Sequence, residues 1–336
     1  MKNMILMVLL FIVPLSYGQT IFSHEREIEN KDKYVFTEID FFNQSDNLKL
    51  SGTLIAPKTT YTKVIIILPG SGKDTRNSHY KLTESFLKNG IAVYRFDERG
   101  VGKSQGKFTT AISGLTYDLA YSIQHLRSLP TLKDKQIGVL GHSLGGMASI
   151  VSHQIISDAK NKIDFLIQIA SPVKSFSDAS RYQIQTLPNY QVKNRSEKEL
   201  VQLLDTLVYI TNQNKYSNIS DTALRQKGIQ AIKTKGFELQ DIKFWSYTHI
   251  DLYKHDYEDA YKQLQIPTIY LIGNRDKYVD PISEVNRLKK INNPLITIKV
   301  MNNLNHYLTS GTLDADVLYN IDESATETIM NWIEKI

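Results

Sequence analysis

The sequence predicts an α/β protein with a mostly parallel central sheet, an antiparallel N-terminal strand pair, helices on both faces and a helical cap insertion. Short aliphatic runs recur at residues 64–68, 91–96, 137–140, 163–169, 268–272 and 295–300. Strands that are apolar on both faces lie inside parallel sheets that helices cover. Apolar residues recur at helical spacing between several runs, at residues 79–89, 115–128 and 144–156. This alternation favours right-handed strand–helix–strand units.

The first two predicted strands have a different pattern. Residues 34–42 and 48–56 alternate between apolar and polar side chains, and Pro57 ends the second segment. Alternation with period two is typical of a strand with one buried face. With residues 44–47 as the connection, we expect an antiparallel hairpin at an edge of the sheet.

The third observation is an interruption between residues 171 and 265, where no convincing buried strand occurs. Residues 196–199 read Ser-Glu-Lys-Glu, the pattern of a helix-capping box. One helical face then follows at Leu200, Leu203, Leu204, Leu207 and Val208. A structureless loop of this length is improbable inside a compact domain. We therefore predict a helical cap at about residues 174–262, inserted into a domain that spans residues 19–336.

Residues 1–18 have the layout of a secretory signal peptide. Lys2 precedes an apolar run at residues 4–13, and Ser16 and Gly18 supply small residues before Gln19. An N-terminal membrane anchor is the alternative, but a bilayer span needs roughly twenty apolar residues. We expect cleavage after Gly18, a secreted or periplasmic protein, and no membrane anchor once the leader is removed.

The composition narrows the classes of protein and of partner. The chain has 336 residues, of which 41% are hydrophobic, and it contains no cysteine. A sizeable core is therefore expected, whereas disulfides and thiolate zinc sites are excluded. Lys and Arg total 40 against 35 Asp and Glu, and the basic residues are dispersed. A small dispersed surplus is typical of a solvated surface, so we expect no nucleic acid partner.

The segment 137–151 contains the strongest chemical motif. Gly141-His142-Ser143-Leu144-Gly145 has the form G-x-S-x-G, directly after a predicted buried strand and directly before a predicted helix. In a nucleophile elbow, the serine occupies a strained turn, and glycines flank it because side chains there would collide with the neighbouring strand and helix. Gly146 is a poor helix former, so we expect a packing reason for it. The alternative is a Gly-Ser turn without chemical meaning.

A nucleophilic serine needs a base and a carboxylate that orients the base. In this architecture both follow later strands, in the order serine, acid, histidine. Asp276 follows the run 268–272, and His306 follows the run 295–300. His306 is the only histidine beyond His255. The order and the placement both predict His306 as the base and Asp276 as the acid.

Other polar residues near these motifs receive different interpretations. Asp280 is the alternative acid, but it precedes Pro281 and is more typical of a helix N-cap. His142, beside Ser143, is predicted to be structural. We interpret His79, His125 and His153 as packing or surface residues, because they fall in predicted helices. No histidine pair has metal-ligand spacing with a carboxylate in reach, so we predict no metal.

A tetrahedral intermediate also needs hydrogen-bond donors for its oxyanion. One expected donor is the backbone N–H of Leu144, directly after the nucleophile, and the other is the N–H of Ser71, in the loop after the first parallel strand. Asp97 and Arg99, in the turn 96–104, are predicted to be structural braces near the site.

With these motifs in order, the chain resembles the α/β-hydrolase superfamily, and within it the exported bacterial esterases of the esterase D kind and their serine-aminopeptidase-like relatives. The resemblance rests on the G-x-L-x-x-P phrase at residues 52–57, Gly70-Ser71-Gly72 with Arg76, the F/Y-D-x-R-G-x-G-x-S turn at residues 96–104, and G-H-S-x-G-G at residues 141–146. The chain departs from many relatives at two positions, with Thr75 in place of an acidic residue and Leu144 in place of glutamate. The resemblance implies hydrolysis of a small-molecule carboxyl ester through an acyl-enzyme, without a cofactor.

Two other activities and one other class of protein stay open from the sequence. The same fold and residues serve a peptidase, an aminopeptidase or an acyl transferase, because they do not determine the leaving group or the acceptor. A non-catalytic binding module with this fold is the remaining alternative. Aromatic residues of the predicted cap are candidates to line an acyl or aromatic pocket, or else to fill an ordinary core: Tyr182, Tyr190, Phe244, Trp245 and Tyr247.

Overall fold

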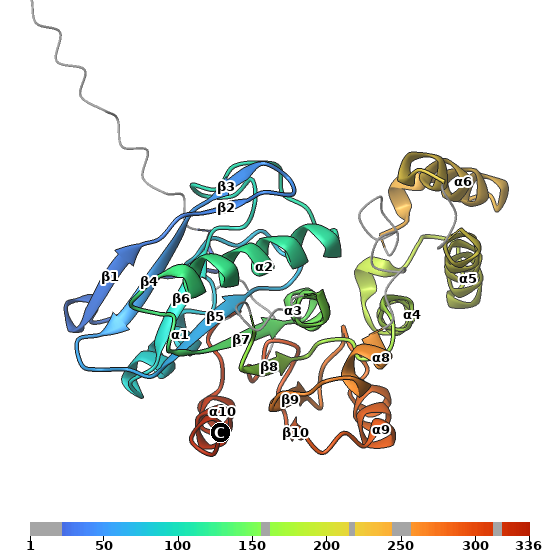
Figure 1. The fold of residues 1–336 in the computed structure, drawn as a ribbon. Coiled ribbons are helices and arrows are strands. Elements are labelled where there is room, and N and C mark those ends of the chain that lie inside the picture. Colours follow the sequence, from blue (N-terminus) through green and yellow to red (C-terminus); the bar gives the residue numbers. More distant parts are fainter. Residues whose placement is uncertain (1–21, 156–161, 215–218, 244–256, 312–317) are drawn as a thin grey trace, which may run out of the picture.

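An eight-stranded sheet forms the centre of the protein in the computed structural model, which describes residues 22–155, 162–214, 219–243, 257–311 and 318–336 (Figure 1). In sheet order, the strands are β1 (Tyr34–Glu38), β4 (Gly52–Pro57), β6 (Ala92–Phe96), β5 (Lys63–Leu68), β7 (Gln136–His142), β8 (Phe165–Ile169), β9 (Thr268–Gly273) and β10 (Ile296–Met301). All neighbours from β6 to β10 pair in parallel, whereas β4 pairs antiparallel with both β1 and β6. The predicted sheet is confirmed.

The central strands are buried because their side chains are apolar on both faces. Val64, Ile65 and Ile66 of β5 are fully buried, as is every residue of β9. Burial of one such side chain stabilises the fold by roughly 1.5–3 kcal/mol. The last strand, β10, is half-buried or exposed along most of its length, as an edge strand is expected to be. The aliphatic run at residues 295–300, expected inside the sheet, is therefore at its edge, because no strand pairs with the other side of β10 among the described residues.

The N-terminal hairpin is antiparallel, as predicted, but it is divided between two sheets. β1 pairs with β4 in the main sheet, whereas β2 (Phe41–Asn43) pairs with β3 (Leu48–Leu50) in a separate two-stranded sheet. The break lies where the Tyr94 hydroxyl donates to the carbonyl of Ile39, at 2.8 Å. The Tyr94 ring also lies against Gly52, where an added Cβ would come within 2.3 Å of the hydroxyl. One buried side chain from β6 thus occupies the position at which the two strand pairs separate.

Helices cover both faces of the sheet (Figure 1). One set packs in succession and consists of α2 (Ile112–Ser128), α3 (Leu144–Ile155), α8 (Tyr257–Lys262) and α9 (Pro281–Ile291). The other set is α1 (Tyr80–Lys88) and α10 (Glu323–Ile333), which pack against each other. The three helices predicted outside the cap are confirmed, although α2 begins three residues earlier than expected. Among the described residues, no helix is long and apolar enough to cross a membrane.

The predicted helical insertion lies between β8 and β9 and extends to the right of the sheet in Figure 1. It contains α4 (Phe176–Thr186), α5 (Glu197–Gln213) and α6 (Asp221–Thr234), with short 3-10 turns at Pro188–Tyr190 and Leu239–Asp241. The capping box at Ser196 and Glu199 is present. These helices share an apolar cluster separate from the main core: Ile184, Leu200, Leu203, Leu204, Leu207, Leu224, Ile232, Phe237 and Ile242. Tyr257 and Tyr261 of α8, in contrast, belong to the main core.

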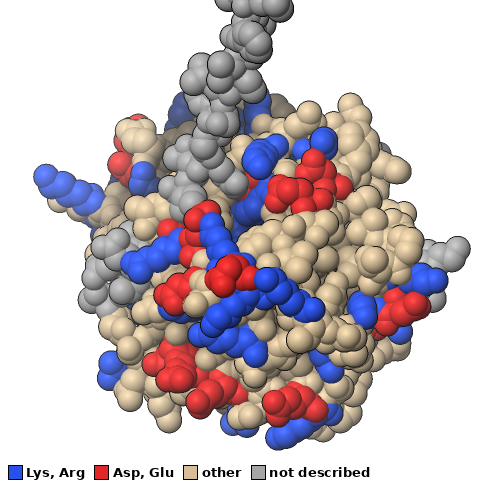
Figure 2. Space-filling view, turned by 90° about the vertical axis from the view of Figure 1, so that its left-hand side faces the viewer, with Lys and Arg blue, Asp and Glu red and all other residues tan. Residues whose placement is uncertain are grey.

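Charged side chains of both signs lie beside each other on the face shown in Figure 2. This view looks at the side of the molecule that carries β1. Ion pairs in this part of the chain join Lys31 to Glu27, Lys49 to Asp40 and Lys103 to Glu38. The basic residues here are accompanied by acidic ones.

Candidate active site

Ser143 occupies a sharp corner between the end of β7 and the first residue of α3. Its backbone φ is 51°, in the left-handed region that L residues rarely adopt. The Ser143 N–H donates to the carbonyl of Ile169 on the neighbouring strand, at 2.8 Å, and the Ser143 carbonyl accepts from the N–H of Gly146, at 3.0 Å. The backbone therefore carries the strain, held by hydrogen bonds on both sides. The expected strand–turn–helix context of the serine is confirmed.

Close packing explains the glycines around this corner. A Cβ on Gly145 would lie 2.3 Å from the carbonyl oxygens of Leu68 and Pro69, and one on Gly141 would lie 2.5 Å from the Cα of Gly146. A Cβ on Gly146 would lie 2.5 Å from the side chains of Gln168 and Ser171. Contacts below 3.0 Å with backbone atoms leave no room for adjustment. The predicted collision with neighbouring elements, and the packing reason for Gly146, are confirmed. Residues 141–146 are called the Ser143 turn below.

Asp276 and His306 lie in two neighbouring loops, residues 274–280 after β9 and residues 302–310 after β10. We call these the Asp276 loop and the His306 loop. His306 Nδ1 lies 2.8 Å from Asp276 Oδ2, and both side chains are buried. The other oxygen, Oδ1, accepts from the N–H groups of Tyr278, at 2.7 Å, and Val279, at 2.9 Å. Because a carboxylate oxygen accepts, Nδ1 donates, which leaves Nε2 as the accepting nitrogen of the imidazole.

Asp280, the alternative acid, has a different role. Its side chain accepts from the N–H groups of Ile282 and Ser283 and caps α9. The prediction of a helix N-cap is therefore confirmed. The Asp280 carboxylate binds N–H groups at the start of α9, whereas the Asp276 carboxylate binds His306.

A cavity of about 110 Å³ joins these elements. Its lining includes Ser143, His306, Leu144 and Ser71, so four of the five predicted site residues border one space, with Asp276 bonded to His306. The rest of the lining consists of Gly70, Thr110, His142, Met147, Pro172, Phe176, Ala179, Gln183, Tyr190, Tyr278, Val279 and Tyr307. The described lining is mostly aromatic and aliphatic, and it contains no Asp, Glu, Lys or Arg.

Comparison with known proteins agrees with the fold and the position of the site. The family model described as serine aminopeptidase, S33, matches residues 59–312. The chain belongs to this family. Residues 59–312 include the Ser143 turn, the Asp276 loop and the His306 loop, as well as the helical insertion. No curated protein matches the chain.

Solved structures similar to this member of the S33 family share its α/β-hydrolase fold. An esterase of Pyrococcus furiosus, Pf2001, has a TM-score of 0.58 at 18% identity, covering 95% of this chain and 98% of the esterase. The α/β hydrolase GrgF from Penicillium sp. sh18 has a TM-score of 0.58 at 14% identity, with 90% and 98% covered. The esterase EaEST from Exiguobacterium antarcticum has a TM-score of 0.53 at 17% identity, with 88% and 98% covered. The predicted α/β-hydrolase fold is thereby confirmed.

His142 lies beside the site of this S33 family member and supports the His306 loop. Its Nε2 lies 3.1 Å from the backbone carbonyl of His306. Because a carbonyl only accepts, His142 donates from Nε2. Burial, with the neighbouring His306 and His79, holds the pKa of His142 well below its usual value, so the ring is neutral. The His142 ring also packs 4.9 Å from that of His306 and 4.6 Å from that of Tyr307. These contacts agree with the structural role predicted for it.

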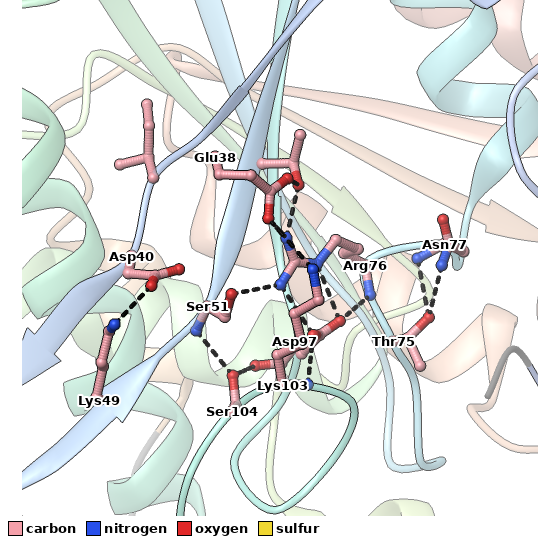
Figure 3. A network of polar contacts seen from close by, with 12 residues as sticks. Glu38, Asp40, Lys49, Ser51, Thr75, Arg76, Asn77, Asp97, Lys103 and Ser104 are labelled. Carbon is pink, nitrogen blue, oxygen red and sulfur yellow. Dashed lines mark hydrogen bonds and ion pairs between the residues drawn. The ribbon is translucent and has the colours of Figure 1, made fainter. Parts of the chain in front are cut away.

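Arg76 follows the loop that carries Ser71, and its side chain lies in a network of polar contacts with Asp97 and Glu38 (Figure 3). The Arg76 guanidinium binds Asp97 through Nη2, at 2.9 Å, and the Arg76 backbone N–H donates to the same carboxylate, at 2.9 Å. Glu38 also binds Arg76, and the N–H of Lys103 reaches Asp97 Oδ2 at 2.9 Å. Asp97 thus joins the Ser71 loop to the turn after β6, which agrees with the predicted role of a structural brace.

Arg99 forms a second brace in the same turn. Its Nε and Nη2 each lie 2.7 Å from the carboxylate of Asp118 on α2, and Nη2 also binds Asp46. The bidentate pairing holds the turn 96–104 against the helix layer. The structural interpretation of Arg99 is therefore confirmed.

One group of side chains near the Ser71 loop has metal-ligand composition. Ligand atoms of His24, Glu25 and Asp74 all lie within 4.8 Å of one another. Asp74, however, accepts from His24, at 2.9 Å, and from Tyr319, at 2.7 Å. Glu25 accepts from the N–H and the hydroxyl of Thr75. The oxygens of this group are therefore engaged in hydrogen bonds that join the N-terminal segment to the loop.

Several lining residues were not anticipated individually. Tyr278 and Tyr307 lie within two positions of Asp276 and His306, and the Tyr278 ring packs 4.8 Å from the His306 imidazole. The sequence signal for these two tyrosines is their closeness to the predicted pair, Asp276 and His306. Of the cap aromatics, Tyr190 lines the cavity, whereas Tyr182 donates to the carbonyl of Asp276. The other three, Phe244, Trp245 and Tyr247, lie outside the described residues.

Proposed function

We propose that the protein is a serine carboxylesterase-type hydrolase that cleaves a small-molecule ester through an acyl-enzyme. The observation that carries the proposal is the arrangement around one cavity. Ser143 stands in a strained turn at its wall, and His306, bonded through Nδ1 to Asp276, lines the same space. A non-catalytic binding module does not need a strained serine beside an oriented imidazole.

In the proposed reaction, Ser143 Oγ attacks the ester carbonyl while His306 Nε2 accepts the hydroxyl proton. His306 then returns this proton to the leaving alkoxide as the C–O bond breaks and the acyl-enzyme forms. Asp276 stabilises the imidazolium, and the N–H groups of Ser71 and Leu144 bind the oxyanion. A water molecule, activated by His306, then releases the acid and regenerates Ser143. No cofactor is required.

The family description favours a second candidate, an aminopeptidase. An enzyme that binds a free peptide N-terminus must compensate a desolvated ammonium group, which a buried or nearby carboxylate does best. The described lining of the cavity contains no Asp or Glu. This argument supports a neutral substrate, and hence an ester, over a substrate with a positively charged amine.

The cavity volume supports a short acyl group. A volume of about 110 Å³ is below the roughly 300–1,000 Å³ that is typical of pockets for drug-sized ligands. We therefore expect the acetate and butyrate esters of p-nitrophenol to be hydrolysed faster than the octanoate and longer esters.

A fluorophosphonate probe tests the nucleophile directly. We expect the wild-type protein to be labelled and to hydrolyse the short p-nitrophenyl esters, and Ser143→Ala to do neither. Ser149→Ala, in the same helix as Leu144, is the matched control and should be labelled normally. Equal labelling of wild type and Ser143→Ala contradicts the proposal. An aminoacyl p-nitroanilide turned over faster than every ester supports the aminopeptidase instead.

We also propose that the protein is exported and acts outside the cytoplasm. The support is the leader-like composition of residues 1–18, which lie outside the described residues. Expression of the full chain with a C-terminal tag should yield a mature protein that begins at Gln19 in N-terminal sequencing. A retained Met1 would contradict cleavage.

A further inference from the structure

The first helix of the insertion, α4, binds the backbone of the Asp276 loop. Gln183 Nε2 donates to the carbonyl of Tyr278, at 3.0 Å, and the Tyr182 hydroxyl donates to the carbonyl of Asp276, at 2.9 Å. The Thr186 hydroxyl lies 2.6 Å from the carbonyl of Lys277. It also lies 2.7 Å from the carbonyl of Tyr182 in its own helix, so these two acceptors share one hydrogen. Three successive carbonyls of the loop thus face one helix.

Two of these carbonyls belong to the peptide groups that hold the Asp276 carboxylate. The peptide between Lys277 and Tyr278 presents its carbonyl to Thr186 and its N–H to Asp276 Oδ1. The next peptide, between Tyr278 and Val279, presents its carbonyl to Gln183 and its N–H to the same oxygen. A peptide group is planar, so a bond that orients the carbonyl also orients the N–H on the opposite side.

A continuous set of contacts therefore leads from the insertion to the imidazole. The α4 side chains hold two peptide planes, the planes hold Oδ1 of Asp276, and Oδ2 of the same carboxylate binds His306 Nδ1. Hydrogen bonds at the two ends of a peptide group also polarise it and strengthen each other. Gln183 is 8% exposed, so water competes little for its bond.

We propose that α4 is a positioning element for Asp276, in which Tyr182, Gln183 and Thr186 set the orientation of the carboxylate and, through it, of His306. This proposal rests on the proposed function for its kinetic consequence. In this proposal, the insertion does more than cover a pocket, because α4 also orients Asp276, the proposed acid. Movement of α4 away from the sheet would remove its hydrogen bonds to the carbonyls of these two peptide groups.

The test removes the donors and keeps the shapes of the side chains, with Tyr182→Phe, Gln183→Met and Thr186→Val. We expect the triple variant to lose about tenfold in kcat on p-nitrophenyl acetate, since each bond contributes modestly, with KM changed by less than about threefold. The matched control makes the same changes elsewhere in the insertion, Thr206→Val and Tyr209→Phe on α5 with Gln230→Met on α6, and should keep the wild-type kcat. If the triple variant does not fold, Gln183→Met alone tests the proposal, with an expected loss of about threefold in kcat.

The same triple substitution in the Asp276→Asn variant distinguishes a positioning role from a general structural effect. If α4 acts through Asp276, the triple substitution should change the residual kcat of Asp276→Asn by less than about twofold, because residues that act as a unit are not additive. A tenfold loss in both backgrounds would overturn the proposal and assign α4 to the pocket wall. An unchanged kcat in the wild-type background would overturn it as well.

A spectroscopic readout is independent of hydrolysis. The proton on His306 Nδ1 should give a downfield resonance that His306→Gln removes, and the triple variant should shift or broaden it. An unchanged resonance in the triple variant overturns the positioning role. A shifted resonance in a protein that is neither labelled by the fluorophosphonate nor active on esters supports the positioning role while contradicting the proposed function, so the two failures are distinguishable.

Discussion

The two sides of the candidate site are held in different ways. On one side, the Ser143 turn is held by backbone hydrogen bonds and by glycines that touch backbone atoms of other elements. On the other side, the Asp276 and His306 loops are held by polar side chains, among them Gln183 of the insertion and His142. The second side also has backbone packing, since a Cβ on Gly273 would lie 2.2 Å from the carbonyl oxygen of Leu304. It differs from the first side in its additional side-chain hydrogen bonds, which single substitutions can remove.

This difference predicts how each side responds to change. Steric packing against backbone has no alternative arrangement, so an added methyl group must distort the strand–helix junction. Hydrogen bonds between side chains and loops are individually modest. We therefore expect substitutions of the glycines in the Ser143 turn to affect folding, and substitutions around Asp276 to affect orientation and activity.

The largest expected effect is the loss of activity when members of the proposed triad are removed. Ser143→Ala and His306→Ala should each lower kcat by about a thousandfold or more, and the double variant should lose no more than the worse single one, because these side chains act as a unit. Steady-state kinetics on p-nitrophenyl acetate measures this.

Asp280→Asn is the control for the acid, since asparagine also caps helices. It should keep kcat within about twofold, whereas Asp276→Asn should not. A larger loss at residue 280 than at residue 276 would exchange their roles.

The next effect is on stability, at the Ser143 turn. Gly145→Ala places a Cβ 2.3 Å from the carbonyl oxygens of Leu68 and Pro69, so we expect a loss of about 3 kcal/mol or more, or failure to fold. Gly72→Ala, where the nearest atom is 3.7 Å away, should change stability by less than about 0.5 kcal/mol. Urea denaturation measures both. Similar stabilities for the two variants would show that close packing does not hold this turn.

We expect stability to depend on pH through Glu284 of α9, which binds the segment between β8 and the insertion. Glu284 Oε2 accepts from the N–H of Val173, at 2.8 Å, and burial raises the pKa of Glu284 from 4.5 to about 7. Between these values, the folded state binds more protons than the unfolded state. Stability contributed by this group therefore falls as pH rises from about 4.5 to 7.

Glu284→Gln removes this titration and keeps an acceptor for the Val173 N–H. The variant should match the wild type near pH 4.5 and exceed it above about pH 7, by up to about 3 kcal/mol. Denaturation midpoints at pH 5 and pH 8 provide the measurement, with the exposed Glu327→Gln on α10 as the control. A difference that does not grow with pH would contradict the prediction.

The smallest expected effect concerns the strain at Ser143. Glycine adopts a φ of 51° without the cost that alanine has there, although glycine also loses more backbone entropy on folding. We expect Ser143→Gly to be more stable than Ser143→Ala by about 0.5–1 kcal/mol. At Ser149, inside α3, the order should reverse, because glycine weakens a helix interior. The same order at both positions would argue against strain in the turn.

Much of the fold could be predicted from local pattern. The aliphatic runs identified the six parallel strands, although they did not show that residues 295–300 form an edge strand. The glycine spacing identified the Ser143 turn. Both constraints act between near neighbours in sequence. The division of the N-terminal hairpin could not be predicted. It depends on Tyr94, whose hydroxyl meets the carbonyl of Ile39 55 residues away.

The candidate site shows the same limit. Asp276 and His306 could be predicted as the acid and the base because each follows a recognisable strand. Asp280 could be predicted as a helix N-cap because it precedes a proline at a helix start. The roles of Tyr182 and Gln183 could not be predicted, since each meets its partner more than 90 residues away in sequence. Such contacts leave no periodic signal in either segment.

The sequence by itself determined the order of strands and helices, the need for glycine around Ser143 and the chain order of the proposed triad, because these follow from local sterics and from apolar periodicity. Only the tertiary structure decided which side chains line the cavity and which hydrogen bonds orient the Asp276 carboxylate. Those contacts join segments that are distant in sequence, and their geometry exists only after the sheet and the insertion have packed.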